Sequence, residues 1–338
     1  MKSERGWNLL DITQFKARLI RAKSDPFARK TLAGKFLQAG WYFLRMLLVF
    51  GLCFVLLYPL LYMLSMTFRP VAESYDPAVI WVPKHFTLDN IREAIRYMNY
   101  GESILNSVLI HIVSSLFQVA VCAVTGYGFA RFAFRGKKIL FSMVLFTLLL
   151  PPQVTIIPLS RVFSSFDFMG LGKLTGLFGA GFELNLLDTP LTFYLPALFG
   201  AGIKSGLFIF IFRQFFRGLP KELEDAAAID GCGFFQTFLK IILPNAAAVC
   251  LTAVILSIVW YWNDYFYSSL FVPNFPTVSL SLSNLSGAYA AEHVMRDPFD
   301  TITLMQAGAL LTVTPILVMY LILQRFFVQG VERSGLVG

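Results

Sequence analysis

Long apolar runs alternate with short polar segments along the chain. A helix needs roughly 18 or more consecutive apolar residues to cross the hydrocarbon core of a bilayer. Backbone polar groups must be satisfied within each such run, so each run predicts a helix. The sequence therefore predicts an all-α, polytopic membrane protein with six transmembrane helices, at residues 41–68, 105–129, 139–159, 191–216, 246–262 and 302–327.

The composition and charge distribution agree with this class. Hydrophobic residues make up 57% of the 338 residues and charged residues 14%, whereas soluble domains contain about 25% charged residues. The net charge of +8 is compatible with nucleic-acid binding, but the positive residues follow the topology. With a cytoplasmic N-terminus, most of the 28 Lys and Arg residues fall on the cytoplasmic side, as the positive-inside rule requires. We expect a multi-pass protein of the cell (plasma or inner) membrane with both termini in the cytoplasm and no nucleic-acid partner.

Polar residues inside the apolar runs are candidates for the transport pathway, because such residues are costly in a membrane and usually face a cavity. Lys204 lies in the fourth run among Gly200, Gly202, Ser205 and Gly206, which permit close helix packing. A structural role is the alternative: Lys204 could extend outward to the interface, and the other side chains could form interhelical hydrogen bonds. The candidates in the runs are Lys204, His111, Gln118 and Gln306.

Two further features concern the same pathway. Pro151, Pro152 and Pro158 interrupt the third run, and broken helices at membrane depth are tolerated where they line a cavity. Aromatic residues crowd the end of the fifth run, at 260–267. An interfacial aromatic belt explains them best. The alternative is a sugar site, for which the candidates are Trp262, Asn263 and Asp264.

The segment between the fourth and fifth runs, KELEDAAAIDGCGFFQTFLKIILP at 221–244, is charged and amphipathic. It resembles the EAA loop of binding-protein-dependent ABC importer permeases: an acidic residue, two alanines, three residues, Gly, nine residues, then I-x-L-P. Asp225 is the one departure, because the family usually has Glu there. In that family the loop is a coupling helix that docks on a separate ATPase subunit; the alternative is an ordinary surface helix. The predicted coupling residues are Glu222, Glu224, Asp225, Ala226, Ala227, Asp230, Gly231, Ile241, Leu243 and Pro244.

Other stretches are similar to the carbohydrate branch of these permeases, including its smaller maltose-type membrane subunit. They lie at 127–141 (YGFARFAFRGKKILF), 150–159, 209–230, 262–264 and 324–338. The resemblance implies the type I ABC importer permease fold, with a six-helix permease domain at 39–330 and a coupling helix at 220–244. The flanking segments, 1–38 and 331–338, are expected to be cytoplasmic. The loop at 161–190 is longer than in the family and carries no motif.

The N-terminal segment is basic, and its apolar residues between positions 7 and 20 recur at roughly helical spacing. An amphipathic helix on the inner membrane surface and a flexible topogenic tail remain two open interpretations.

The resemblance also implies a function and a set of partners. The chain would form half of the pathway for a sugar or oligosaccharide delivered by an extracytoplasmic solute-binding protein. Its partner in the lipid bilayer would be a second permease subunit, forming a heterodimer, and an ATPase subunit dimer would bind on the cytoplasmic side. The sequence has no GxxxxGK[ST] loop, so we expect no enzymatic activity and no cofactor in this chain, with ATP–Mg on the partner ATPase. Its histidines and cysteines lack the spacing of a metal site.

Three alternatives stay open: a permease for a non-sugar solute, a secondary transporter or channel, and a membrane scaffold. Secondary transporters usually carry internal repeats and intramembrane carboxylates, neither of which is evident in this sequence.

Overall fold

The computed structural model describes residues 26–76, 81–167, 184–294 and 301–335. These residues are almost entirely helical, with one isolated β-bridge between Phe166 and Leu184. The chain divides into two units, residues 1–62 and 63–338, which are described separately. The predicted amphipathic helix near residues 7–20 lies outside the described residues, as does most of the 161–190 loop.

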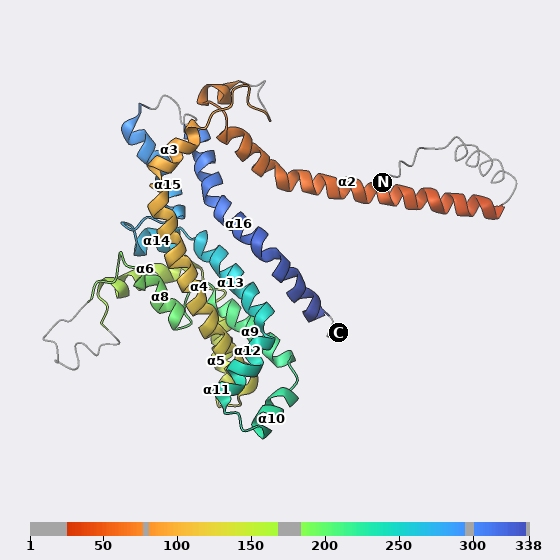
Figure 1. The fold of residues 1–338 in the computed structure, drawn as a ribbon, viewed down its shortest axis with the longest axis vertical. Helices are drawn as coiled ribbons and strands as arrows, with labels where there is room; N and C mark the ends of the chain where they lie inside the picture. Colours follow the sequence, from red (N-terminus) through yellow and green to blue (C-terminus); the bar gives the residue numbers. More distant parts are fainter. Residues whose placement is uncertain (1–25, 77–80, 168–183, 295–300, 336–338) are drawn as a thin grey trace. The chain divides into compact units, whose positions relative to one another are not determined.

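The first unit contains most of one long helix, α2 (Pro26–Thr67), and the second unit contains the remaining elements (Figure 1). These are η1 (Val71–Tyr75), α3 (Asp89–Tyr97), α4 (Tyr100–Arg131), α5 (Lys137–Phe146), α6 (Pro152–Ser164), α8 (Leu191–Leu198), α9 (Ser205–Gly218), α10 (Glu222–Ile229), α11 (Phe234–Thr237), η3 (Phe238–Ile242), α12 (Leu243–Asn245), α13 (Ala247–Trp262), α14 (Phe266–Phe271), α15 (Val278–Glu292) and α16 (Ile302–Gly335).

Three helical segments are long and apolar enough to cross a membrane: Leu37–Thr67, Tyr100–Arg131 and Ile302–Gln324. A fourth span results if Phe234–Asn245 and Ala247–Trp262, which meet at a bend of 78°, are counted as one. The first, second and sixth predicted spans are therefore found as continuous helices. The last of them, α16, runs on to Gly335, into the segment predicted as a cytoplasmic tail.

The third and fourth predicted spans are each divided in two. The third is interrupted as the prolines predicted, because α5 ends at Phe146 and α6 begins at Pro152. The fourth was predicted as one helix over 191–216, and this prediction is wrong. Helix α8 ends at Leu198 and α9 begins at Ser205. Gly200 and Lys204 have φ angles of 70° and 60°, which a right-handed helix cannot contain.

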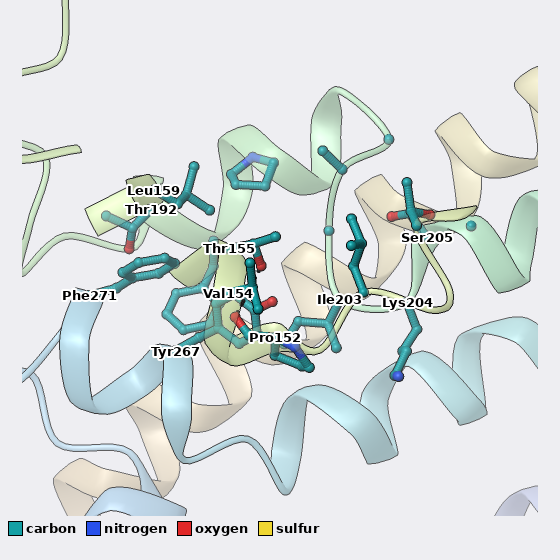
Figure 2. Close-up of a pocket in the computed structure, with 18 of the residues that line it drawn as sticks. Pro152, Val154, Thr155, Leu159, Thr192, Ile203, Lys204, Ser205, Tyr267 and Phe271 are labelled. Carbon is teal, nitrogen blue, oxygen red and sulfur yellow. Dashed lines mark hydrogen bonds between the residues drawn. The ribbon is translucent and has the colours of Figure 1, made fainter. Parts of the chain in front are cut away.

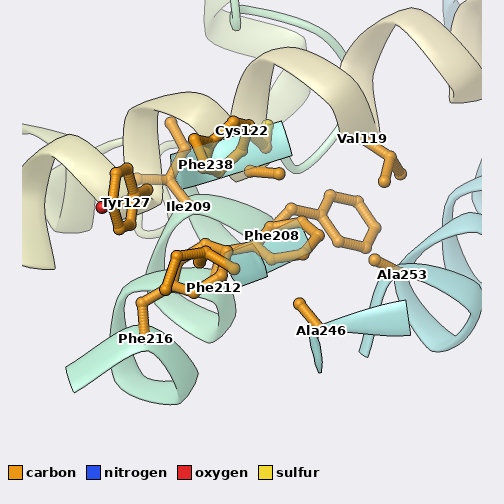
Figure 3. Packing of buried hydrophobic residues seen from close by; sticks show 12 residues of the cluster. Val119, Cys122, Tyr127, Phe208, Ile209, Phe212, Phe216, Phe238, Ala246 and Ala253 are labelled. Atoms are coloured by element: carbon orange, nitrogen blue, oxygen red, sulfur yellow. The ribbon is translucent and has the colours of Figure 1, made fainter. Parts of the chain in front are cut away.

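The core of the second unit is the contact between α4 and α9. Phe208, Phe212 and Phe216 recur every four residues, so they lie on one face of α9, and all three are fully buried. Figure 3 shows these rings opposite Cys122 and Tyr127 of α4, in a cluster with Phe238 and Ala246. The cluster joins α4, α9 and the segment that precedes α13.

Gly126 allows α4 and α9 to approach each other at this contact. A Cβ atom at position 126 would lie 2.6 Å from Phe212 Cβ, 3.0 Å from Arg213 N and 3.2 Å from Ile209 O. Two of these neighbours are backbone atoms, which cannot move aside as a flexible side chain can. Small residues at helix contacts are the usual means of close association in membranes.

We expect Gly126→Ala to destabilise the protein by about 1–3 kcal/mol, because the added methyl group forces α4 away from α9. The control is Gly128→Ala in the same helix, where the nearest atom to an added Cβ is Phe132 Cδ2 at 3.8 Å. Thermal unfolding in detergent, followed by tryptophan fluorescence, should show a lower midpoint for Gly126→Ala only. Equal midpoints for the two variants would contradict this packing.

Candidate functional site

The predicted coupling segment begins with α10, whose end is set by glycine. Gly231 has a φ of 77°, in the left-handed region that glycine adopts without strain. The N–H of Gly231 donates to Ala228 O at 3.1 Å and that of Cys232 donates to Ala227 O at 2.9 Å. These two bonds form a Schellman motif, which satisfies the last carbonyls of the helix. The structure thus places a tight turn at Gly231, directly after α10.

The single coupling helix predicted over 220–244 is wrong in its extent. After α10 the chain turns and continues as α11, the π-helical turn Phe238–Ile242 and the short α12. Ile241, Leu243 and Pro244 therefore belong to the bend that leads into α13 rather than to α10. Proline at 244 fits this place, because it stands in the first turn of α12, where its missing N–H leaves no hydrogen bond unmade.

The acidic residues of α10 lie in two different environments. Glu224 is turned inward: Tyr127 Oη donates to Glu224 Oε1 at 2.8 Å, and Arg131 Nε lies 2.9 Å from the same oxygen. Arg131 also donates from Nη2 to Leu219 O at 2.7 Å. Glu222, Asp225 and Asp230 are exposed.

The outer surface of this segment combines charge with apolar side chains. Ile229 is 87% exposed and Phe235 is 71% exposed. Ala226, three residues before Ile229, is also exposed, whereas Ala227 is buried. Exposed large apolar residues beside polar ones mark interaction surfaces. This surface lies at the end of the second unit away from α3 and α15 (Figure 1).

A pocket of about 600 Å³ lies elsewhere in the second unit, among α6, α8, the α8–α9 break and α14. Figure 2 shows Tyr267 and Phe271 at one end of the pocket and Lys204 and Ser205 at the other. The lining is mostly apolar, with hydroxyl groups from residues such as Thr155 and Tyr267. Lys204 is its only charged lining residue in the described part of the chain. A pocket with aromatic faces and a few hydroxyl groups is suited to a small solute.

Lys204 lies at the N-cap of α9 and not within the continuous helix over 191–216 that the sequence predicted. Its ammonium group is 5.3 Å from the centre of the Trp260 ring, within the range of a cation–π contact. Close packing around it is confirmed at two positions. A Cβ at Gly206 would lie 2.6 Å from Thr147 Oγ1, and a Cβ at Gly202 would collide with Tyr261 Oη and lie 2.7 Å from Gln118 Oε1.

Gln118 and Tyr261 hold the backbone of the α8–α9 break. Gln118 Nε2 donates to Ile203 O at 2.6 Å, and the N–H of Ile203 donates to Tyr261 Oη at 3.3 Å. Both backbone groups of Ile203 are thereby satisfied by side chains from α4 and α13, which a break at membrane depth requires. Gln118 does not line the pocket in the described residues; it supports the wall that Ile203 forms.

His111 lies one layer behind this wall and is fully buried. Its ring stacks near Tyr261 at 6.4 Å between centroids and meets Trp262 edge-on at 5.9 Å. Neither ring nitrogen has a hydrogen-bond partner among the described residues. His111 therefore does not line the pocket in this structure, and its role in a pathway stays a prediction.

The remaining candidates differ in their burial and hydrogen-bond partners. Tyr261 and Trp262 are 1% and 4% exposed, so an interfacial belt is wrong for these two residues. Trp262 Nε1 donates to Thr312 O at 3.0 Å within a core cluster. Asn263 is exposed and donates to Val259 O at 2.8 Å, and Gln306 is partly exposed on α16.

Asp264 has a structural role at the start of α14. Its carboxylate accepts hydrogen bonds from the backbone N–H groups of Ser268 at 2.9 Å and Tyr267 at 3.3 Å. Burial raises the pKa of the Asp264 carboxyl to about 6, and these hydrogen bonds only partly offset the effect. A carboxylate that accepts these N–H groups is not directed at a solute.

Sequence reasoning missed three contributors to these two regions. Ile203 lines the pocket and has no sequence pattern that distinguishes it, whereas Tyr267, which also lines the pocket, belongs to the aromatic residues at 260–267. Arg131, which pairs with Glu224, does have a signal, because it belongs with Tyr127 to the YGFAR stretch at 127–131.

Comparison with known proteins gives relatives over most of the chain. The arabinooligosaccharides transport system permease protein AraQ of Halalkalibacterium halodurans is 30% identical over 295 residues, covering 85% of this chain and 93% of that protein. The trehalose transport system permease protein SugB of Mycobacterium tuberculosis is 29% identical over 284 residues, covering 83% of this chain and 93% of that protein.

A solved structure shares the fold. It is the crystal structure of a bacterial ABC transporter involved in the import of the acidic polysaccharide alginate, one chain of which matches with a TM-score of 0.63 and 18% identity, covering 85% of this chain and 96% of that chain. Residues 119–333 match the family of binding-protein-dependent transport system inner membrane components. This match includes α9, the coupling segment and the bend into α13, and the chain is therefore a member of that family, a permease of an ABC importer.

Proposed function

We propose that this chain is one of two permease subunits of an ATP-driven importer for a sugar or oligosaccharide. The observation that carries the proposal is the α10 segment, where exposed carboxylates and exposed apolar side chains stand on a helix that Gly231 ends sharply. The sugar class is supported by the printed names of relatives that transport arabinooligosaccharides and trehalose. The alternative is an importer for a non-sugar solute, and screening of the cognate binding protein against candidate solutes decides between the two.

The proposal includes six membrane spans, of which the third and fourth are broken helices. Helices α5 and α6 have 10 and 13 residues, and α8 and α9 have 8 and 14. At about 1.5 Å per residue, each pair provides more than about 30 Å of helix, which matches the hydrocarbon thickness of a bilayer. Helix α13, the second member of the bent pair, supplies the fifth span.

The proposed orientation places α10 and both termini in the cytoplasm. Arg131, Lys137, Arg213, Arg217 and Lys221 all lie in or beside the elements near α10, which is the distribution that the positive-inside rule associates with the cytoplasmic side. The opposite end of the second unit, with α3 and α15 (Figure 1), then faces the solute-binding protein.

The proposed assembly contains a second permease, an ATPase dimer that holds ATP–Mg, and an extracytoplasmic solute-binding protein. Asp225 is exposed in the first turn of α10 and is free to form a charge-assisted hydrogen bond with an Arg of the ATPase. Ile229 and Phe235 supply the apolar part of the same interface. Two ATP sites require two docking helices, and this chain has one, so a partner permease with its own docking helix completes the complex.

We expect Gly231→Ala to uncouple ATP hydrolysis from transport while the protein remains in the membrane. Alanine in the left-handed region costs about 1–2 kcal/mol, and relief of this strain changes the end of α10. Gly233→Ala is the matched control, because Gly233 has a φ of −73° and an added Cβ meets nothing within 4 Å at either position. In proteoliposomes, Gly231→Ala and Asp225→Ala should each lower the amount of solute taken up per ATP hydrolysed. An unchanged ratio in both variants would refute the role of α10 in coupling.

We expect substrate-dependent transport only from the heteromeric complex. Thermal-shift screening of the cognate binding protein against a panel of sugars should identify the substrate, and proteoliposomes with both permeases should then accumulate it. Full transport by this chain as a homodimer with the ATPase would disprove the heterodimer. A binding protein stabilised only by non-sugar solutes would disprove the substrate class.

We expect Lys204→Cys to react with a membrane-impermeant thiol reagent and substrate to slow the reaction, because position 204 lines the pocket. The background replaces Cys53, Cys232 and Cys250 and retains Cys122, which is fully buried. Ile157→Cys on α6 is the negative control, because Ile157 is 64% exposed in the proposed third span and does not line the pocket, so lipid should shield it from the reagent. Labelling at 204 that substrate leaves unchanged would place Lys204 outside the pathway.

A further inference from the structure

Helix α4 touches both regions that the proposed function needs. Near its C-terminal end it contacts the coupling segment through Tyr127 and Arg131, and near its middle it contacts the α8–α9 break through Gln118. Gln118 and Arg131 are separated by about 20 Å along the helix. Figure 1 shows α4 extending through the second unit towards the end where α10 and α11 lie.

We propose that α4 carries movement of α10 to the wall of the pocket, with Tyr127 and Arg131 as the positioning residues that fasten α10 to α4. The proposal rests on the proposed function in one respect, namely that an ATPase moves α10. It adds a role for Glu224 that differs from that of the exposed acids: Glu224 fastens α10 to its own subunit.

The continuity of α4 suits it to this role. Its 32 residues form one helix without proline, whereas the neighbouring predicted spans are broken between α5 and α6 and between α8 and α9. A rigid element that contacts two sites can change both together. The broken helices absorb displacement at their breaks, where the backbone lacks continuous helical hydrogen bonds.

The contact at α10 is largely removed from water. The side chains of Arg131 and Glu224 are 8% and 22% exposed, and removal of one partner of a buried ion pair leaves the other charge uncompensated. Arg131 also bonds Leu219 O, directly after α9. One guanidinium group therefore fixes the end of α9 and the first turn of α10 to the last turn of α4.

The ring of Tyr127 adds apolar packing to this polar contact. Its centroid lies 5.5 Å from that of Phe216, 5.4 Å from Phe234 and 5.0 Å from Phe238. Phe216 belongs to α9, whereas Phe234 and Phe238 follow the Gly231 turn, in α11 and the π-helical turn. Tyr127 therefore contacts the coupling segment after that turn through its ring and before it through Glu224. Displacement of the segment therefore acts on α4 through packing as well as through charge.

The contact at the break is equally direct. Gln118 donates to Ile203 O, and Tyr261 accepts from Ile203 N–H. A Cβ at position 202 would clash with both of these side chains. Ile203 and Lys204 line the pocket. A shift of α4 therefore moves the carbonyl of Ile203 or breaks its hydrogen bond, and either outcome changes the pocket wall.

The chain offers a competing route, because α9 joins the break to α10 covalently. The two routes make different predictions for Glu224→Gln, which weakens the contact between α4 and α10 and leaves α9 intact. If α9 alone transmits the movement, Glu224→Gln has no effect on the pocket.

The test uses the assembled complex with Ala201→Cys as a reporter, because Ala201 is exposed and lines the pocket within the break. Exposed native cysteines are replaced as for Lys204, and the rate of thiol labelling is measured with and without a non-hydrolysable ATP analogue. We expect ATP to change the rate in the otherwise unaltered complex. Glu224→Gln and Tyr127→Phe should reduce this change by roughly two- to thirtyfold, and Glu93→Gln, the same chemical change on α3, should not.

A second measurement needs no ATPase. Hydrogen–deuterium exchange of the amides of α10 in the isolated permease should be faster in Glu224→Gln and Tyr127→Phe than in the unaltered protein or in Glu93→Gln. The double variant should add less than the sum of the two single effects, because both side chains act through the same oxygen.

The possible results distinguish a failure of the proposed role of α4 from a failure of the proposed function. If the rate of thiol labelling at position 201 in the otherwise unaltered complex did not change with the ATP analogue, the proposed function would be refuted. The hydrogen–deuterium exchange measurement would still decide whether Glu224 holds α10 against α4. Undiminished ATP-dependent labelling in both variants would overturn the role of α4 and assign transmission to α9. Unchanged exchange in both variants would overturn the role of Glu224.

Discussion

The close contact between α4 and α9 at Gly126 determines how the rest of the second unit is arranged. Lipid chains are as apolar as leucine, so helices in a membrane associate by close packing and hydrogen bonding. Gly126 removes the side chain that would separate the two backbones, and Phe208, Phe212 and Phe216 fill the space along the contact. With α9 held in this way, its two ends, the break before Ser205 and the coupling segment after Gly218, both lie beside α4.

Backbone satisfaction explains where the irregular segments occur. The break between α8 and α9 leaves backbone N–H and C=O groups without helical partners. The side chains of Gln118 and Tyr261 form the hydrogen bonds that the two backbone groups of Ile203 require. The end of α10 is satisfied by its own Schellman motif. The pocket forms beside the first of these irregular segments, as expected where non-helical backbone at membrane depth lines a cavity.

The coupling segment illustrates how one short sequence divides between two tasks. Glu224 and Asp225 are adjacent and chemically alike, yet Glu224 faces Tyr127 and Arg131 while Asp225 is exposed. The consecutive residues of a helix point in directions about 100° apart, so neighbours in sequence cannot share a partner. One acid is thus available to hold the segment, and the next is available to a second protein.

The sequence by itself determined the membrane class, the long helices α2, α4 and α16, the interruption of the third apolar run by proline, the turn at Gly231 and the family. The structural features among these follow from local properties, namely apolar length, a missing N–H or a missing Cβ, and the family follows from the spacing of the motif at 225–244. Tertiary structure alone decided that the fourth run breaks at residues 199–204, since apolar length cannot reveal that α4 and α13 supply hydrogen bonds to a non-helical backbone there. It also decided that Trp262 and His111 are buried and that Glu224 pairs with Arg131, because these outcomes depend on which side chains of distant segments meet, and no single segment contains that information.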